Sequence, residues 1–248
     1  MHLPHVTVAL ALSTAFYVIG YSAGIAAFSW LARKRGIATE GIFILMAAGL
    51  IGGLIGANLT QYLATGLPGK TVLGGIATGY LCVVIAKRLL GIRRPTGDLF
   101  ALGISAGEAI GRWGCFFAGC CGGKIAPRGL PWAVWQDGAW RHPSQAYDSI
   151  ANAAIFVLLL RLLRRNPPEN MLFFVQGVLY CAARFAIEYY RESSAAAAGL
   201  TLAQWACLAG FSYFGIRLAL MVRSRRRLIM QDGETQRTLS EPPVAAYP

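Results

Sequence analysis

The sequence predicts an all-α, polytopic membrane protein with seven transmembrane helices, the N-terminus outside and the C-terminus in the cytoplasm. Its 248 residues are 56% hydrophobic and 14% charged, whereas charged residues make up roughly 25% of soluble domains. Uncharged apolar runs recur at a length of about 20 residues, which crosses ~30 Å of hydrocarbon as a helix. Basic residues collect in alternate loops. The composition therefore indicates a membrane protein, the length of the apolar runs indicates its transmembrane helices, and the basic loops indicate the direction in which each helix crosses.

The seven spans follow one another along the chain. The first, 6–32, has no positively charged leader and is far longer than the roughly 7–15 apolar residues of a cleaved signal, so it is expected to be retained. The second, 41–64, and the seventh, 201–216, are equally uninterrupted. Spans three to six carry polar residues or are slightly short: 71–86, 99–119, 144–160 and 171–190.

The spans are expected to form one membrane domain, residues 1–227, without an internal repeat or a soluble linker. Glycines recur at small-xxx-small spacing in the second and third spans, for example Gly49 with Gly53 and Gly75 with Gly79, and indicate closely packed helices. Residues 228–248 are polar, contain two adjacent prolines and are expected to form a disordered cytoplasmic tail.

The distribution of lysine and arginine sets the direction of the spans. The net charge of +12 does not gather in one basic patch, so it does not indicate a nucleic-acid partner. The basic residues instead follow the odd-numbered spans: Arg33, Lys34, Arg35; Lys87, Arg88, Arg93, Arg94; Arg161, Arg164, Arg165; Arg223, Arg225, Arg226, Arg227. By the positive-inside rule these segments face the cytoplasm, and the loops 65–70, 122–143 and 191–199 face outward.

Two spans carry a pair of opposite charges inside the membrane. Glu108 and Arg112 lie four residues apart in the fourth span, as do Arg184 and Glu188 in the sixth, so each pair shares a helix face. At a rise of 1.5 Å per residue, Arg112 lies roughly 21 Å and Arg184 roughly 20 Å from the inner surface. Asp148, about one turn into the fifth span, falls near the same level.

Two interpretations of these charges are open. Each pair could neutralise itself and serve only to hold helices together. A charge at membrane depth costs at least ~2.5–3.5 kcal/mol, however, so buried charges in spanning helices indicate function by default. Two arginines at one depth on different helices predict an anion site that opens toward the outer leaflet, because the planar guanidinium makes paired hydrogen bonds to phosphate.

Three motifs extend this interpretation. They are GRWGCFFAGC at 111–120, RHPSQAYD at 141–148 and RFAIEYYRE at 184–192. In this order they resemble the prolipoprotein diacylglyceryl transferases of the bacterial inner membrane. The family's corresponding segments read Gly-Arg-x-Gly-Asn-Phe-x-Asn-Gly-Glu, Arg-His-Pro-Ser-Gln-Leu-Tyr-Glu and Arg-x-x-x-Glu-Phe-x-Arg. The family's plan of seven helices with the N-terminus outside agrees with the predicted topology.

The resemblance implies a lipid transfer at the outer face of the inner membrane. Phosphatidylglycerol donates a diacylglyceryl group to the lipobox cysteine thiol of a lipoprotein precursor, and glycerol phosphate leaves. Arg112 and Arg184 match the family's essential arginines, which are expected to bind the phosphate and stabilise the leaving group. Glu188 and Cys120 are further candidate catalytic residues. No cofactor and no metal are expected.

His142 and Gln145, in the second motif, are candidate lipid contacts. His142 is followed by Pro143 and Ser144, a combination typical of a helix start, so a structural role and a catalytic role both remain open for it. The sequence differs from the family pattern at three positions. Leu73 stands in place of a histidine before the third helix, Cys115 in place of the signature asparagine, and Cys120 in place of its glutamate.

Cys115, Cys120 and Cys121 cluster beside Arg112, and three interpretations are open. They could be small residues that pack in a tight turn, or reactive thiols, because a nearby guanidinium lowers a thiol's pKa. A metal site is disfavoured, because there is no clear fourth ligand and no C-x-x-C pair. On a continuous helix Cys115 and Cys120 would face different directions, although the glycines could break the helix. The alternative function is therefore a thiol-dependent membrane redox protein, or a lipid-binding relative without transferase activity.

Overall fold

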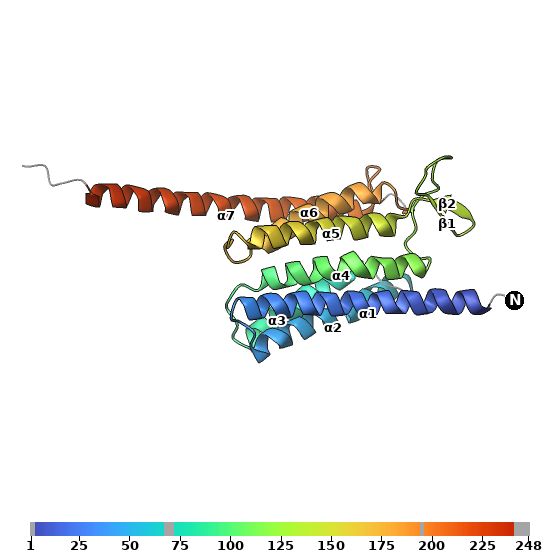
Figure 1. Ribbon diagram of the computed structural model, residues 1–248, viewed down its shortest axis with the longest axis horizontal. Coiled ribbons are helices and arrows are strands. Elements are labelled where there is room, and N and C mark those ends of the chain that lie inside the picture. Colours follow the sequence, from blue (N-terminus) through green and yellow to red (C-terminus); the bar gives the residue numbers. More distant parts are fainter. Residues whose placement is uncertain (1–2, 67–71, 194–195, 241–248) are drawn as a thin grey trace, which may run out of the picture.

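The structure, a computed structural model, describes residues 3–66, 72–193 and 196–240. In this part of the chain it contains seven helices and one short hairpin (Figure 1). The helices are α1 (Leu3–Lys34), α2 (Glu40–Thr65), α3 (Val72–Leu89), α4 (Gly97–Phe117), α5 (Ser144–Leu163), α6 (Met171–Glu188) and α7 (Leu202–Ser240). The strands β1 (Val134–Gln136) and β2 (Ala139–Arg141) pair antiparallel between α4 and α5. Apart from this hairpin, the prediction of an all-helical protein with seven helices is confirmed.

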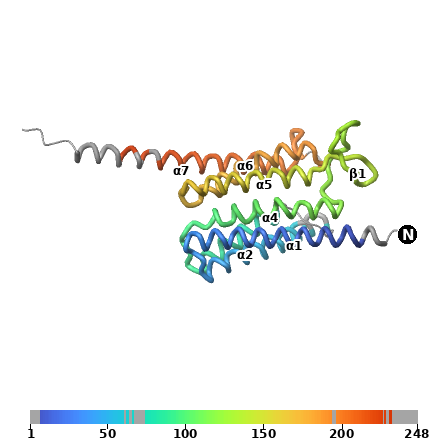
Figure 2. The backbone as a smooth tube through the Cα atoms, in the orientation of Figure 1, coloured from blue at the N-terminus to red at the C-terminus, as the bar shows by residue number. Residues whose placement is uncertain are grey.

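The helices form two groups that meet where α4 faces α5 and α6. In the first group, α1 packs along α4 and α2 packs along α3; in the second, α6 packs against both α5 and α7. Figure 1 shows the hairpin and the start of α1 at one end of the molecule. The connections α1–α2, α3–α4 and α5–α6 lie at the other end, and the tube in Figure 2 shows α7 extending beyond them. These two ends are called the hairpin end and the connection end below.

Glycines allow two helix pairs to approach closely. A Cβ atom on Gly24 of α1 would lie 2.8 Å from the carbonyl oxygen of Gly103 on α4, which is shorter than any normal contact. Between α2 and α3, a Cβ on Gly79 would lie 3.0 Å from the carbonyl oxygen of Gly49. The close packing predicted for the second and third spans is therefore confirmed, and α1 and α4 form a second such crossing.

Five helices in the described residues are long and apolar enough to cross a membrane. They comprise Thr7–Lys34, Glu40–Thr60, Ser144–Leu163, Met171–Glu188 and Leu202–Arg225. Large apolar side chains such as Leu10, Leu59, Ile150 and Ile216 are exposed on their surfaces. A soluble protein rarely exposes so much contiguous apolar surface, so these faces suit contact with lipid. α3 and α4 are not among the five; α4 carries Glu108 and Arg112 and packs against three other helices.

The seventh helix is longer than the sequence predicts. The expected span ended at residue 216 and a disordered tail was expected from 228, but α7 continues to Ser240, so residues 228–240 are helical. The physical reason is that this stretch contains no proline before Pro242, so nothing interrupts the helix after its apolar part ends. The rest of the predicted tail, 241–248, lies outside the described residues.

The apolar core lies in the half of the molecule nearer the connection end. Leu99 and Leu102 of α4, Leu159 of α5 and Leu172 of α6 are fully buried there. Leu31 of α1 is also fully buried in the same cluster. Because lipid is as apolar as leucine, this cluster holds the two helix groups together through close packing of side chains rather than through their removal from water.

Asp98 closes the connection end of this core. The carboxylate is fully buried and pairs with Arg35, whose Nη2 lies 2.7 Å from Asp98 Oδ2. It also accepts hydrogen bonds from the backbone amides of Asn170 and Phe173 at 3.1 and 3.0 Å. Asp98 thereby ties together the ends of α1, α4 and α6, and it is a structural charge with its partners in place.

Candidate anion site between α4, α5 and α6

Three arginines converge on one buried carboxylate near the hairpin end. Asp148 on α5 is 2% exposed. Its oxygens lie 3.7 Å from Arg112 Nη1 and 3.9 Å from Arg184 Nη1. The Nη1 atom of Arg191, in the loop after α6, lies 3.7 Å away. The prediction that Arg112, Arg184 and Asp148 share one depth is confirmed.

These three distances are longer than the roughly 2.7–3.2 Å of a hydrogen bond. The arginines therefore surround Asp148 without being saturated by it. In the part of the chain that the structure describes, the Nη1 atoms of Arg184 and Arg191 are buried and have no hydrogen-bond partner, and the same is true of Asp148 Oδ2. Buried donors of this kind normally have a partner, because an unpartnered charged group is costly. The arrangement thus offers free cationic N–H groups to an anion.

Arg112 on α4 and Arg184 on α6 each also pair with a glutamate one helical turn away on the same helix. Arg112 Nε donates to Glu108 Oε2 at 2.6 Å, and Arg184 Nη2 lies 2.8 Å from Glu188 Oε2. Glu188 in turn accepts a hydrogen bond from the Ser193 hydroxyl at 2.7 Å. The two predicted i,i+4 pairs are therefore present. They orient the guanidinium groups, and in doing so they leave Nη1 of each arginine directed to Asp148.

The start of α5 is fastened to the end of α4, which places Asp148 beside Arg112. The Ser149 hydroxyl donates to the Ala109 carbonyl, and the Ser144 hydroxyl donates to the Cys121 carbonyl at 2.7 Å. Gln145 Nε2 donates to the Cys120 carbonyl, also at 2.7 Å. The Gln145 Oε1 atom is buried and has no hydrogen-bond partner among the described residues. Gln145 therefore lies at the loop next to the arginines with one acceptor free.

His142 belongs to an aromatic cluster next to this loop. Its Nδ1 lies 3.1 Å from the Tyr147 hydroxyl, and its ring centroid is 5.0 Å from that of Tyr190. α5 begins at Ser144 with Pro143 as the N-cap residue, so the helix start predicted there is confirmed. The side chain of Leu73, at the position of the family's histidine, lies outside the described part of the structure.

The chain reverses at the end of α4 and brings the three cysteines together. α4 ends at Phe117, Gly119 adopts a φ of 67°, and the Cys120 amide donates to the Cys115 carbonyl at 3.1 Å. The sulfur atoms of Cys115, Cys120 and Cys121 all lie within 4.8 Å of one another. The glycine thus breaks the helix in the way that the sequence left open, and the thiols share one side of the turn.

Cys121 also adjoins the arginine cluster. Hydrogen bonds from the Cys115 and Cys120 thiols lower the pKa of the Cys121 thiol, and the Arg191 guanidinium beside it lowers it further. For Cys120, hydrogen bonds with Cys115 and Cys121 raise the pKa instead. If one thiol of the cluster ionises first, it is therefore Cys121, whereas the sequence directed attention to Cys120.

Arg191 is a site residue that the sequence analysis did not single out, although it is the last arginine of the third motif, RFAIEYYRE. It follows α6 and was treated as part of an outward-facing loop, yet its guanidinium contacts Asp148 and lies 3.5 Å from Glu188. The signal was present in the spacing: Arg184, Glu188 and Arg191 are separated by four and three residues, which places all three on one side of a helical path.

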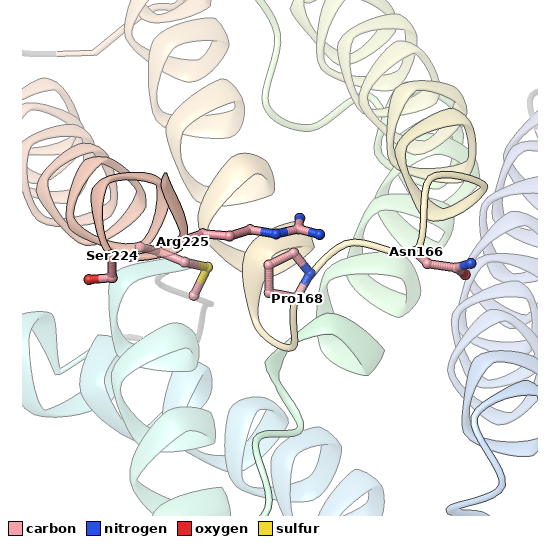
Figure 3. A pocket seen from close by; sticks show the side chains of 5 residues that line it. Asn166, Pro168, Ser224 and Arg225 are labelled. Carbon is pink, nitrogen blue, oxygen red and sulfur yellow. The ribbon is translucent and has the colours of Figure 1, made fainter. Parts of the chain in front are cut away.

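A separate pocket of about 340 Å³ lies at the connection end, between the α5–α6 loop and α7 (Figure 3). It is lined by Asn166, Pro168, Met221, Ser224 and Arg225. Figure 3 shows the Arg225 side chain extending from α7 toward Pro168. With one charged side chain in its lining, this pocket does not have the converging charges found at the hairpin end. The arginine cluster is therefore the candidate functional site.

Fold and site together define a helical membrane protein with a cluster of three arginines around a buried aspartate between its helices. Residues 5–221 match the family described as prolipoprotein diacylglyceryl transferase, and the chain belongs to this family.

Three relatives illustrate the range of similarity. A protein of Janthinobacterium sp. (strain Marseille) is 31% identical over 73% of this chain and 79% of its own length. A protein of Geobacter sulfurreducens is 28% identical over 85% of this chain and 90% of its own length. One from Clostridioides difficile (strain 630) is 34% identical over 62% of this chain and 61% of its own length, so the matched part is less than two thirds of that relative. All three are named phosphatidylglycerol–prolipoprotein diacylglyceryl transferase.

Proposed function

We propose that the protein transfers a diacylglyceryl group from phosphatidylglycerol to the lipobox cysteine thiol of a lipoprotein precursor, at the outer face of the bacterial inner membrane. Membership of the family and the names of its relatives support this activity. The observation that carries it is the convergence of Arg112, Arg184 and Arg191 on Asp148, with two buried guanidinium nitrogens that have no hydrogen-bond partner among the described residues.

The arginines bind the phosphate of the lipid and stabilise the charge that develops on it in the transition state. Phosphatidylglycerol carries one negative charge on its phosphodiester, and the departing glycerol phosphate carries more. Donors that are fixed in advance around the phosphate stabilise this added charge, and they act more strongly in a site from which water is excluded. Arg184 and Arg191 offer their free Nη1 atoms, and Arg112 completes the set from α4. Glu108 and Glu188 keep the guanidinium groups in position.

The remaining candidate residues border this cluster. Gln145 offers its free Oε1 to a hydroxyl of the lipid headgroup. His142, packed with Tyr147 and Tyr190, contacts the lipid from the loop between the hairpin and α5. Cys120 stands at the position of the signature glutamate and lines the turn that Gln145 fastens.

All seven helices cross the membrane in this proposal, with the N-terminus outside, the C-terminus in the cytoplasm and the hairpin outside. The eighteen residues of α3 span about 27 Å at 1.5 Å per residue, close to the thickness of the hydrocarbon layer. The basic segments that follow α1, α3 and α5 gather at the connection end, as an inner surface requires (Figure 1). Reporter fusions at Lys124 and Arg93 test this topology. Lys124 is expected outside and Arg93 inside, and a cytoplasmic signal from Lys124 contradicts the proposed site.

The transfer itself is tested by complementation of a strain depleted of its own transferase, together with an assay on purified protein, phosphatidylglycerol and a lipobox peptide. The wild-type protein is expected to restore growth and form the diacylglyceryl thioether. Arg184→Lys is expected to fail, because lysine keeps the charge but loses the planar fork. Arg94→Lys is the matched control, since Arg94 pairs with Glu169 at the connection end. A wild-type protein that is inserted and folded but forms no thioether contradicts the proposal.

A thiol-dependent redox function is a second candidate, and the observation in its favour is the close approach of the three thiols. Unlike diacylglyceryl transfer, a redox reaction of these thiols requires no lipid. Reduction of a disulfide probe that depends on Cys121 and is unaffected by phosphatidylglycerol supports the redox function. Thioether formation that depends on the lipid supports the transferase.

A further inference from the structure

We propose that Cys115, Cys120 and Cys121 form a binding site for a thiophilic divalent cation, with zinc the ion whose preferences they match best. The three sulfur atoms come from the end of α4 and the turn after it, and all lie within 4.8 Å of one another. All three are free thiols. At a zinc–sulfur distance of about 2.3 Å, tetrahedral ligands lie roughly 3.8 Å apart. A small inward movement of the thiols therefore reaches the required geometry.

The turn that carries the thiols is fixed by its own backbone and by α5. Gly119, in the left-handed region, turns the chain back, and the Cys120 amide bonds to the Cys115 carbonyl. Gln145 and Ser144 bind the carbonyls of Cys120 and Cys121 from the first turn of α5. The three carbonyl groups are thus occupied. The Cys120 thiol donates a long hydrogen bond of 3.6 Å to the Cys115 carbonyl, which a metal ion at the sulfur atoms would replace. A site held in this way needs little reorganisation to bind a metal.

Cys121 has a backbone conformation that few residues other than glycine adopt. Its φ is 61°, between Cys120 and Gly122. Side chains are held in this region mainly where the surrounding structure requires it, and such positions concentrate at functional sites. Glycine would fit this position without strain, and the cysteine there places its sulfur atom beside those of Cys115 and Cys120.

The surroundings of the thiols suit a metal bound by three thiolates. Such a complex with a divalent ion carries one net negative charge, and the Arg191 guanidinium interacts with Cys121 beside it. The Tyr17 hydroxyl lies 3.2 Å from Cys115 Sγ and can support that ligand from the second coordination layer. Cys120 and Cys121 are exposed, so the fourth position of a tetrahedral ion faces the solvent.

This fourth position gives the metal a task that rests on the proposed transferase function. The acceptor cysteine binds there through sulfur and loses its proton to water, because a thiol that coordinates zinc is deprotonated. The thiolate then attacks the glyceryl carbon of phosphatidylglycerol. A carbon–sulfur bond forms, the carbon–oxygen bond to phosphate breaks, and the electron pair leaves on glycerol phosphate, which the arginines hold. The metal thereby activates the nucleophile in a chain that has Leu73 where the resembled enzymes have a histidine.

Metal binding is tested on the full-length protein in detergent, purified with reductant, stripped by a chelator and titrated with Zn²⁺ or Co²⁺. One ion per chain is expected, and the cobalt form should show a sulfur-to-cobalt charge-transfer band. Cys115→Ser, Cys120→Ser and Cys121→Ser should each weaken binding by more than the ~10–100-fold that loss of an outer partner costs. Cys82→Ser, in α3, is the matched control and should bind like the wild type.

Two results overturn the metal site. The first is zinc binding that is absent, or that is unchanged in all three serine variants. The second is a disulfide between any two of these thiols in protein isolated without reductant or added metal.

The role in transfer is measured separately from phosphatidylglycerol binding. Stripping the metal should abolish thioether formation, zinc should restore it, and native mass spectrometry should show the lipid still bound to the stripped protein. If the stripped protein transfers at the full rate, the metal has no role in transfer while the proposed function stands. If zinc binds with the expected dependence on the cysteines but the loaded protein makes no thioether, the metal site stands and the proposed function fails.

Discussion

The two halves of the interface between α4, α5 and α6 are built from the same helices but differ in chemistry. Toward the connection end the contact consists of leucines, among them the fully buried Leu99, Leu102 and Leu159. Toward the hairpin end, the same helices contribute Arg112, Asp148 and Arg184 at similar depth of burial. Along α4, for example, the contacts with α5 and α6 change from apolar packing at Leu102 to ionic interaction at Arg112, which is about three helical turns away.

The comparison separates stability from function. The leucine half needs no ligand, because closely packed apolar side chains stabilise one another by dispersion contacts. The arginine half is costly, because buried charges must be desolvated and Asp148 is not hydrogen-bonded by the arginines around it. A sequence selected for stability alone would replace this half by apolar residues. The proposed phosphate ligand accounts for the presence of these charges.

The largest expected effect is on transfer activity in the arginine half. Arg112→Lys and Arg184→Lys should each lower the rate of thioether formation by ~10–100-fold, since each loses a charge-assisted hydrogen bond worth about 1.5–3 kcal/mol. The rates are measured with purified protein, and Arg94→Lys should be close to the wild type. A full rate in both variants would show that these arginines are only structural partners of Glu108 and Glu188.

The leucine half should respond in the opposite way. Leu102→Ala should lower the free energy of unfolding in detergent by about 2–5 kcal/mol, because it leaves a cavity in the apolar core. Its transfer rate per folded molecule should be unchanged, because Leu102 lies away from the arginine cluster. Unfolding is followed by circular dichroism and activity by thioether formation. A loss of activity without a loss of stability would break the distinction between the two halves.

The crossing of α1 and α4 should show a smaller effect on stability. Gly24→Ala places a methyl group 2.8 Å from the Gly103 carbonyl oxygen, so the helices must separate, at a cost of about 1–3 kcal/mol. Gly215→Ala is the matched control, because a Cβ there meets no atom within 4 Å and alanine favours the helix. Both are compared by thermal unfolding. Equal melting temperatures for the two variants would show that the close crossing carries no strain.

The smallest effect concerns the pH dependence of thiol labelling. The pKa of Cys121 is lowered and that of Cys120 is raised, so Cys121 remains a thiolate at lower pH. In metal-free protein, the labelling rate of Cys121 by a maleimide should therefore fall by less than the ~10-fold per pH unit of an ordinary thiol with a pKa near 8.5. Peptide mass spectrometry separates the two sites. Arg191→Gln should steepen the profile of Cys121, and identical profiles for Cys120 and Cys121 would contradict the assignment.

The sequence predicted the features that depend on distance along a helix. Arg112, Asp148 and Arg184 meet because a fixed rise per residue converts a count into a depth. The glycine packing of α2 and α3 followed from spacing in the same way. Features that depend on where the chain turns, or on where a helix ends, were not predicted. Arg191 reaches the site from the loop after α6, and α7 extends past its apolar segment because helix formation does not require a membrane.

The thiol cluster shows the same limit. A count along α4 separates Cys115 from Cys120, and only the turn at Gly119 brings them together. The sequence disfavoured a metal site because it offers no clear fourth ligand and no C-x-x-C pair. The structure brings three sulfur atoms together without adding a fourth protein ligand among the described residues. The pairing of Arg35 with Asp98 was also beyond sequence reasoning, because it joins residues far apart in the chain.

The central claim is that the arginine cluster binds the phosphate of phosphatidylglycerol, and direct measurement of lipid binding tests it most sharply. Native mass spectrometry of the wild type, Arg184→Lys and Arg94→Lys, each with phosphatidylglycerol and with the zwitterionic lipid phosphatidylethanolamine, compares site and lipid in one experiment. The wild type and Arg94→Lys are expected to retain phosphatidylglycerol in preference to phosphatidylethanolamine, and Arg184→Lys is expected to lose that preference. Equal retention of phosphatidylglycerol by all three proteins would contradict the claim.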